Sequence, residues 1–270
     1  MKPLDPLSQP ELLLAFDYDG TLCCPHTELD ITPEFFQTIR TLREERVALW
    51  GIDTGRSLMQ MVAGLTEARF PFLPDFIIAR EREIYTPNNF GRWLPVNPWN
   101  KICDKAHTKL FRKSRKFLAH VQAWVESETV AVWGQQEGEP AGIVASSVEE
   151  MDGIVAWLNE QLAGYPLLDF QRNGIYMRFS HRDYHKGTAL LEVAKLCGLT
   201  AQETFAIGDS HNDLDMLNRE IANWIACPTN ACEEVKAQVA QNGGYVASSP
   251  ASQGVVESLK AAFLSAIVPE

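Results

Sequence analysis

The sequence predicts a doubly wound α/β fold, in which parallel strands alternate with helices around a buried sheet. The first observation is a set of four short apolar runs, each of which ends abruptly in a polar cluster: 12–16, 47–52, 76–79 and 204–207. Runs that are apolar on both faces are typical of strands buried within a parallel sheet. The second observation is that segments with a helical spacing of apolar residues lie between these runs.

Three helices are indicated beside these strands. The first begins at Thr32 and Pro33, because a Thr N-cap followed by Pro is typical of a first helical turn. The second follows Ser57, where apolar residues recur at helical spacing. The third covers 188–197 and ends before Gly198, since glycine is typical of the position after a helix.

The middle of the chain follows a different pattern, in which longer helices separate pairs of short strands. The predicted elements are a helix over 105–127, strands over 130–133 and 142–146, a helix over 151–162, and a hairpin of 167–170 with 175–179. This order is typical of a small α+β module. We therefore predict a smaller α+β domain over 85–179, inserted into a core that comprises 1–84 and 180–270.

Charge and hydropathy limit the classes of partner. The 270 residues include 24 Lys and Arg against 35 Asp and Glu, which gives a formal net charge of −11. Nucleic acids and anionic membranes attract basic surfaces, so we expect neither as a partner. No apolar run approaches the roughly 20 residues of a membrane span, and no signal peptide is evident. We expect a cytoplasmic protein that is a monomer or a weak dimer.

The cysteines do not suggest a structural metal site. They lack the paired spacing that structural zinc sites use, so we expect reduced thiols and no structural zinc. The six residues are Cys23, Cys24, Cys103, Cys197, Cys227 and Cys232.

The polar clusters should meet at one place, because ligands of an open α/β sheet bind beyond the carboxyl ends of its strands. Asp17 and Asp19 directly follow the first apolar run, and Gly20 and Thr21 come next. Two carboxylates this close repel each other unless a cation is present, and Mg²⁺ prefers oxygen ligands. The alternative is an ordinary turn, since Asp and Gly are common turn residues.

Two further clusters suit a phosphate. Asp53, Thr54, Gly55 and Arg56 follow the second apolar run and offer a hydroxyl and backbone N–H groups at a strand-to-helix turn. The alternative there is a helix cap. Lys186 stands at the start of a predicted helix, where its charge opposes the helix dipole but would hold a phosphate. The alternative for this lysine is a solvated surface position.

The fourth cluster, over 208–216, is the most specific. It reads Gly-Asp-Ser-His-Asn-Asp-Leu-Asp-Met, and three Asp and one Asn after an apolar strand are hard to explain by packing. It lacks the Gly and Glu spacing of a calcium-binding EF-hand loop. Together, the four clusters predict a phosphate site with a bound cation.

These motifs resemble those of a known family. In this order, DYDGT (17–21), DTGR (53–56), HKGTAL (185–190) and GDSHNDLDM (208–216) are similar to the four motifs of the haloacid dehalogenase (HAD) superfamily of phosphohydrolases. The insertion between the second and third motifs resembles the α/β cap of subclass IIB, the Cof-like and sucrose-phosphatase-like branch. The resemblance implies a Rossmann-like core, a Mg²⁺-dependent phosphatase activity, and a cap domain that selects the substrate.

The resemblance also implies a role for each motif residue. Asp17 is the nucleophile that forms an aspartyl-phosphate, and Asp19 is the general acid and base. The side chains of Asp17 and Asp209, with the backbone carbonyl of Asp19, hold Mg²⁺. Lys186 is catalytic and holds the transferring phosphoryl group, while Asp213 orients Lys186 or a metal-bound water. The phosphate- and substrate-binding residues that it implies are Thr54, Gly55, Arg56 and Asn212.

Three functions stay open at this stage. The first is a phosphatase that acts on a sugar phosphate or a similar small phosphomonoester. The second is a sugar phosphomutase similar to phosphomannomutase, and the third is a non-catalytic regulator that binds metal and phosphate. The intact set of motif residues argues against the third. In the run 80–83, the bulky Arg-Glu-Arg-Glu sequence departs from the small Asn/Gly turn usual in this branch.

Substrate contacts are expected from the insertion, where basic and aromatic side chains would hold a second anionic group or a sugar ring. The alternative is a solvated helix face and ordinary packing. His181, His185 and His211 flank the motifs and are interpreted as surface or supporting residues, since Mg²⁺ prefers oxygen. The candidate contacts are Trp93, Trp99, Lys105, Lys109, Arg112, Lys113, Arg115, Lys116, Tyr176 and Arg178.

Overall fold

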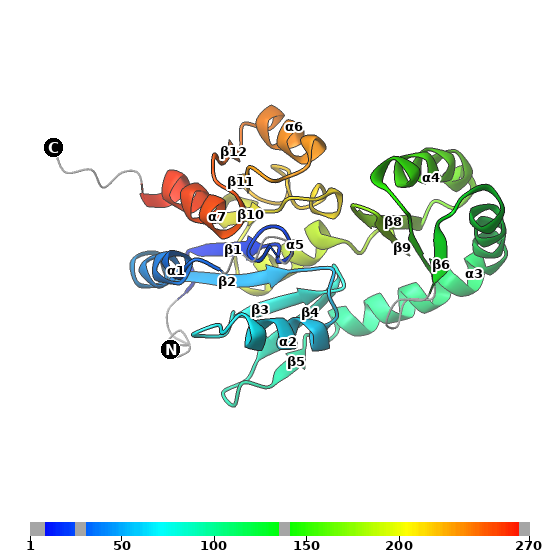
Figure 1. The fold of residues 1–270 in the computed structure, drawn as a ribbon. Coiled ribbons are helices and arrows are strands. Elements are labelled where there is room, and N and C mark those ends of the chain that lie inside the picture. The colour runs from blue at the N-terminus through cyan, green and yellow to red at the C-terminus, as the bar shows by residue number, and fades with distance from the viewer. Residues whose placement is uncertain (1–8, 25–30, 135–140, 265–270) are drawn as a thin grey trace. The chain divides into compact units, whose positions relative to one another are not determined.

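The computed structural model describes residues 9–24, 31–134 and 141–264. These residues form two compact units (Figure 1). The first combines the chain up to Val96 with the chain from Lys186 onward, and the second runs from Asn97 to His185. None of the helices in the described ranges has both the length and the apolar character that a membrane span requires.

The first unit is built on an eight-stranded sheet with the order β12-β11-β10-β1-β2-β3-β4-β5. From β12 to β3 neighbouring strands are parallel, whereas β4 and β5 pair antiparallel at one edge. The strands are β1 (Leu12–Phe16), β2 (Ala48–Asp53), β3 (Phe76–Ala79), β4 (Glu83–Pro87), β5 (Trp93–Pro95), β10 (Thr204–Ile207), β11 (Trp224–Cys227) and β12 (Tyr245–Val246).

The strand order places the expected ligand-binding position at the centre of this sheet. The chain passes outward from β1 through β2 to β3, and later outward from β10 through β11 to β12 on the other side. The direction of winding therefore reverses between β1 and β10, which are paired neighbours. In open α/β sheets, ligands bind beyond the carboxyl ends of the strands at this reversal. The predicted doubly wound core is confirmed.

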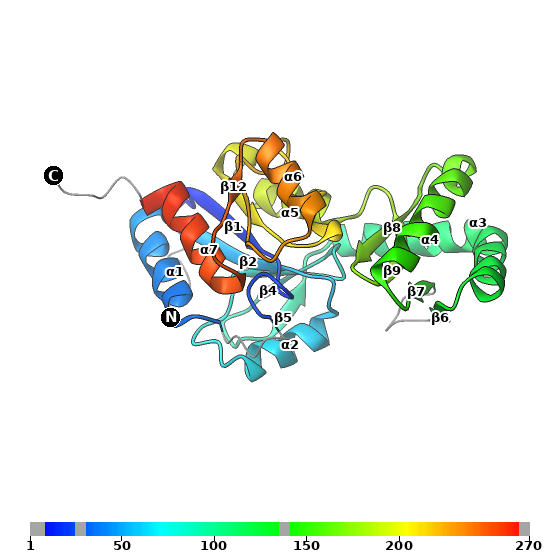
Figure 2. The same cartoon turned by 45° about the horizontal axis from the view of Figure 1, so that its top comes forward.

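Helices cover the sheet and close the core of the first unit. All five residues of β1 are buried, as the apolar run predicts. Trp50 of β2 is fully buried and packs edge-on against Phe35 of α1. Helices α1 and α7 lie side by side in contact with each other (Figure 2). The helices are α1 (Pro33–Arg46), α2 (Leu58–Glu67), α5 (Lys186–Leu196), α6 (Glu233–Gln241) and α7 (Ala251–Leu259).

Short helical turns complete the first unit. Two of them border β10, and the third follows α7. They are the 3-10 turns Ala201–Glu203 and His211–Asp213 and the π-helical turn Lys260–Leu264.

The second unit has its own sheet and its own apolar core. The four-stranded antiparallel sheet has the order β6-β7-β9-β8, and one of its faces packs on α3 and α4. This α+β composition agrees with the pattern that the sequence shows in its middle part. Its elements are α3 (Trp99–Glu128), β6 (Val132–Gly134), β7 (Gly142–Val144), α4 (Val148–Gln161), the 3-10 turn Leu162–Gly164, β8 (Leu168–Asn173) and β9 (Tyr176–His181).

The limits of the second unit differ from the limits that the sequence pattern suggests. The inserted domain is expected over 85–179, but β4 and β5 continue the large sheet, so the second unit begins at Asn97. Its last strand, β9, runs to His181, and the unit ends at His185. Helix α3 begins at Trp99, six residues before the expected start at 105. Trp93 consequently belongs to the first unit, where it packs against the core.

Candidate active site

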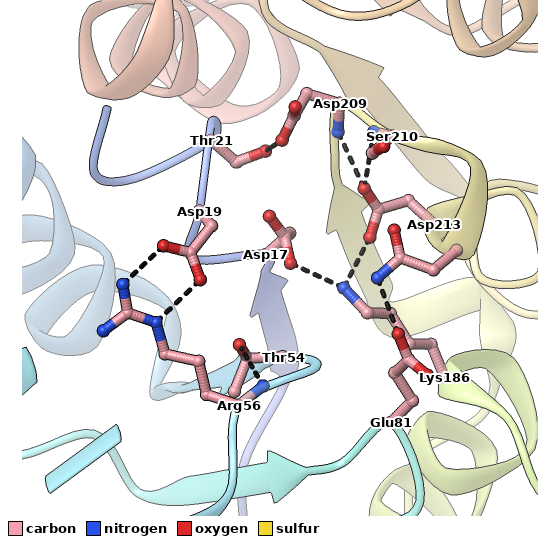
Figure 3. A network of polar contacts seen from close by, with 11 residues as sticks. Asp17, Asp19, Thr21, Thr54, Arg56, Glu81, Lys186, Asp209, Ser210 and Asp213 are labelled. Atoms are coloured by element: carbon pink, nitrogen blue, oxygen red, sulfur yellow. Dashed lines mark hydrogen bonds and ion pairs between the residues drawn. The ribbon is translucent and has the colours of Figure 1, made fainter. Parts of the chain in front are cut away.

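The four polar clusters meet at the carboxyl ends of β1, β2 and β10 and at the start of α5 (Figure 3). Asp17 is the first residue after β1, and its N–H donates to the carbonyl oxygen of Ile207 at the end of β10 (3.0 Å). Its side chain is buried. The fold therefore brings the four clusters together, as the sequence pattern predicts.

Lys186 joins two of the clusters. Its Nζ donates to Oδ1 of Asp17 and to Oδ1 of Asp213, both at 2.6 Å. The lysine is fully buried, not solvated. Burial opposes its positive charge, but the carboxylates of Asp17 and Asp213 outweigh this effect and hold the pKa of Lys186 well above its usual value. Lys186 is therefore a charged group inside the protein, held between two carboxylates.

Asp213 is fixed in place from two sides. While Oδ1 accepts from Lys186, Oδ2 accepts from the backbone N–H groups of Asp209 and Ser210 (2.8 and 2.9 Å). Gly208 is needed for this approach, because a Cβ there would lie 2.3 Å from Cγ of Asp213. The family resemblance implies that Asp213 orients Lys186 or a metal-bound water, and the structure places its carboxylate against Lys186.

Asp209 faces the loop that follows β1. Its Oδ1 accepts from the hydroxyl of Thr21 (2.7 Å). Gly20 has a φ of +90°, and a Cβ at this position would lie 2.3 Å from Oδ2 of Asp209. Any larger residue would collide with the carboxylate, so Gly20 serves both the turn and the close approach. Burial, with the nearby charge of Asp213, raises the pKa of Asp209 to about 7.

The carboxylates form a group that can hold a divalent cation. Oxygen atoms of Asp17, Asp209 and Asp213 lie within 4.8 Å of one another. Oδ2 of Asp17 is buried and accepts no hydrogen bond from the residues that the structure describes. Burial raises the pKa of Asp17 well above its usual value despite the opposing effect of Lys186, so an ionised Asp17 needs a further positive charge. The all-oxygen donor set suits a hard cation such as Mg²⁺.

The carboxylate of Asp19 does not join this acidic group but pairs with Arg56. Arg56 donates from Nε to Oδ2 of Asp19 (2.7 Å) and from Nη2 to Oδ1 (2.6 Å), which is a two-point ion pair. The guanidinium also lies over the ring of Tyr18, 4.7 Å from its centroid. Arg56 is thus occupied with Asp19, although the resemblance implies a contact with phosphate.

Thr54 and Gly55 form the turn between β2 and α2. Thr54 is buried; its N–H donates to Ile78 (2.9 Å), and its hydroxyl accepts from the N–H of Arg56 (3.1 Å). The alternative interpretation of this motif, a helix cap, does not apply, because Ser57 caps α2 in a capping box.

Sequence reasoning missed the role of Glu81. This residue is buried, and its Oε1 accepts from Nδ2 of Asn212 (2.7 Å). Arg80 and Glu81 both have positive φ, 49° and 64°, which is a strained backbone for residues other than glycine. The N–H of Glu81 donates to the carbonyl of Thr54 (2.9 Å) and secures this turn. In the sequence, only the unusual Arg-Glu-Arg-Glu run at 80–83 distinguished this segment, and that run does not indicate the contact of Glu81 with Asn212.

Two other residues at the site were not assigned a role from sequence. Asn230 donates from Nδ2 to the carbonyl of Gly20 (2.8 Å) and accepts at Oδ1 from the N–H of Ala251 (2.8 Å), so it ties the β1 loop to the start of α7. Asp53, the last residue of β2, is fully buried, and burial raises its pKa well above the usual value.

The candidate substrate contacts of the second unit are mostly exposed on helix α3 and strand β9. Tyr176 is exposed on β9, and Trp99 packs edge-on against Tyr184 at 5.3 Å. Of the two roles expected for His181, surface or supporting residue, the surface role does not apply, because His181 is buried and its N–H donates to Nε2 of His107 (3.2 Å). The six basic candidates all lie on exposed positions of α3: Lys105, Lys109, Arg112, Lys113, Arg115 and Lys116.

Comparison with curated proteins gives partial matches to phosphatases. The chain is 35% identical over 97 residues to a phosphoglycolate phosphatase of Archaeoglobus fulgidus, which covers 36% of this chain and 40% of that protein. It is 33% identical over 76 residues to a phosphoglycolate phosphatase of Methanosarcina acetivorans, with 28% and 31% covered. The aligned segments thus span less than half the length of these relatives.

Solved structures are similar over nearly the whole fold. The sucrose-phosphatase of Synechocystis sp. PCC6803, solved with sucrose and phosphate, has a TM-score of 0.68 at 19% identity, covering 93% of this chain and 98% of that one. A sugar phosphatase of HAD subclass IIB has a TM-score of 0.63 at 17% identity, with 93% and 98% covered. The fold is therefore that of the branch which the sequence resembles. Residues 75–259 match the haloacid dehalogenase-like hydrolases, and the chain belongs to that family.

Proposed function

We propose that this protein is a Mg²⁺-dependent phosphatase that hydrolyses a small phosphomonoester, in particular a sugar phosphate, through a phosphorylated Asp17. The observation that carries this proposal is the state of Asp17: one carboxylate oxygen is held by Lys186, and the other is buried beside Asp209 with no donor among the described residues. A carboxylate in this position becomes an ionised nucleophile when Lys186 and a bound cation together balance its charge.

The residues would divide the reaction into two steps. In the first, a carboxylate oxygen of Asp17 attacks phosphorus, the bond to the alcohol oxygen breaks, and Asp19 gives that oxygen a proton. In the second, Asp19 takes a proton from water, the water oxygen attacks phosphorus, and the bond to Asp17 breaks to release phosphate. Lys186 stabilises the phosphoryl oxygens in both steps. Bound Mg²⁺ would supply charge neutralisation between Asp17 and the phosphoryl group.

The proposed ligands of the cation and the proposed ligands of the phosphate rest on different observations. Asp17 and Asp209 lie within one acidic group, as the ligand set for Mg²⁺ requires, with the backbone carbonyl of Asp19 as the third proposed ligand. Thr54 and Gly55, in the turn after β2, would bind phosphoryl oxygens through hydroxyl and N–H groups. The amide of Asn212 would bind there too, oriented by Glu81.

The substrate class rests on two kinds of similarity. The solved structures with the same fold include a sucrose-phosphatase and a sugar phosphatase, while the curated relatives are phosphoglycolate phosphatases. In the second unit, Tyr176 and Arg178 occupy neighbouring positions on the same face of β9, where a sugar ring and a second anionic group could be held. We therefore favour sugar phosphates and keep phosphoglycolate as the comparison substrate.

The test is free phosphate released from a panel of sugar phosphates, polyol phosphates, nucleotides and phosphoglycolate, with Mg²⁺ and with EDTA. We expect release that requires Mg²⁺ and is concentrated on a sugar phosphate. Release without any acceptor sugar argues against a phosphomutase. If no substrate on the panel is hydrolysed while Mg²⁺ binds, the proposed activity is wrong.

Arg56 is expected to act through Asp19 and not through the substrate, because the Nε and Nη2 edge of its guanidinium is engaged by that carboxylate. Arg56→Lys keeps the charge and loses the two-point geometry, so we expect kcat to fall about tenfold or more with KM nearly unchanged. Steady-state kinetics separate the two quantities. A rise in KM with kcat unchanged would instead assign Arg56 to phosphate binding.

Glu81 is expected to position Asn212 by accepting its amide hydrogen. Glu81→Gln keeps an acceptor at this place, so activity should stay within a few-fold of the wild type. Glu81→Ala removes the acceptor, and we expect KM to rise about tenfold, as for a lost hydrogen bond to a charged group. Equal losses in both variants would show that the charge of Glu81 matters and not its hydrogen bond.

A further inference from the structure

A second group of metal-binding side chains lies outside the acidic group of the active site. It consists of His211, Cys232 and Glu234, whose donor atoms all lie within 4.8 Å of one another. His211 begins the short 3-10 turn His211–Asp213 after β10, while Cys232 is the N-cap of α6 and Glu234 lies in its first turn. Two segments far apart in the sequence thus supply the three donors.

Two of the donors lie at the spacing of ligands on one tetrahedral ion, and the third lies within 4.8 Å of both. Nε2 of His211 lies 3.7 Å from Oε2 of Glu234. The Cys232 thiol forms a side-chain hydrogen bond with the Glu234 carboxylate. Ligand atoms of a tetrahedral zinc are bonded at about 2.0–2.3 Å and therefore lie about 3.3–3.8 Å apart. Only small side-chain movements would bring the three donors onto one ion.

The chemistry of the donors distinguishes this group from the acidic one. One nitrogen, one sulfur and one oxygen ligand suit Zn²⁺ and similar transition-metal ions, whereas Mg²⁺ prefers oxygen alone. The Glu234 side chain is 64% exposed and that of His211 19%, so an ion can enter from solvent, and a water can fill a fourth position. Binding would release the thiol proton of Cys232 to solvent.

We propose that His211, Cys232 and Glu234 form a second metal site, which takes Zn²⁺ or a similar transition-metal ion. The ion would join the start of α6 to the loop that carries Asp209. These two segments are already linked, since the N–H of Cys232 donates to the carbonyl of Asp209 (2.9 Å). The sequence pattern did not indicate this site, because a ligand set with only one cysteine has no paired cysteine spacing.

Cobalt supplies the spectroscopic test, because Co²⁺ replaces Zn²⁺ and absorbs visibly in tetrahedral sites. With excess Mg²⁺ present to fill the acidic group of the active site, we expect the EDTA-treated full chain to bind one Co²⁺ with a thiolate-to-cobalt charge-transfer band, which Zn²⁺ abolishes. Cys232→Ser should lose this band and bind Zn²⁺ at least about tenfold more weakly. The control Cys197→Ser, whose cysteine is also half-buried, should keep both properties.

Thermal unfolding gives a second measurement that does not depend on a spectrum. In excess Mg²⁺, which fills the acidic group, Zn²⁺ should raise the unfolding midpoint of the wild type and of Cys197→Ser but not that of Cys232→Ser or His211→Gln. A cobalt spectrum without the thiolate band, or one that Cys232→Ser leaves unchanged, would overturn the proposal. Asp17→Asn should retain the band, so this test is independent of phosphatase activity.

Discussion

Replacing Asp17 with Asn is expected to abolish phosphate release and to leave the fold intact. The amide is isosteric with the carboxylate but is not a nucleophile, so we expect kcat to fall by at least about 10⁴-fold. The matched control is Asp53→Asn, which changes another fully buried aspartate, at the end of the neighbouring strand β2. Kinetics with the best substrate and circular dichroism of both variants check this expectation.

The Asp53→Asn control distinguishes the loss of the nucleophile from the effect of removing a buried charge. Asp53 takes no part in the proposed steps, so Asp53→Asn should retain most of the wild-type kcat. If Asp17→Asn still turns over, or if both variants lose activity equally, the assignment of Asp17 as nucleophile is wrong.

Replacing Lys186 with Met is expected to have the largest effect on stability. Lys186 is the cation that the carboxylates of Asp17 and Asp213 share, and all three side chains are buried. Removing one partner of a buried ion pair costs about 3–5 kcal/mol, because the remaining charges lose their compensation. We expect this loss in the free energy of unfolding in urea, together with the loss of phosphate release.

A second variant shows whether uncompensated charge is the cause. Adding Asp213→Asn to Lys186→Met removes one of the two stranded carboxylates, so part of the lost stability should return while activity stays absent. If Lys186→Met unfolds at the same urea concentration as the wild type, the buried ion pairs do not have the energetic role described here.

Much of the core could be predicted because a parallel sheet leaves a clear sequence pattern. Strands such as β1 are buried on both faces and are read as continuous apolar runs, and each run ends where the polar residues begin. The edge strands β4 and β5 were missed because they have only five and three residues and neither forms a continuous buried apolar run. These two strands extend the sheet from β3, and local sequence does not reveal this pairing.

The parts of the site that escaped prediction depend on side-chain geometry. The ion pair between Asp19 and Arg56 joins two motifs that were each assigned to the substrate or its leaving group. The contact of Glu81 with Asn212 requires two consecutive residues at positive φ, which nothing in the residue types Arg80 and Glu81 predicts. Such contacts can be identified only in the folded structure, where the loops lie together.

The central claim is that the phosphoryl group passes through Asp17, and trapping that intermediate tests it most directly. Asp19→Asn should slow its hydrolysis, because Asp19 is the proposed base for the attacking water, while a substrate whose leaving group needs no proton, such as a nitrophenyl phosphate, still forms the intermediate. Mixed with substrate and Mg²⁺ and quenched in acid, this variant should gain the mass of one phosphoryl group, and borohydride reduction followed by peptide mapping should place it at residue 17. Substrate hydrolysis without any phosphorylated protein, or a phosphoryl group found on another residue, would contradict the account.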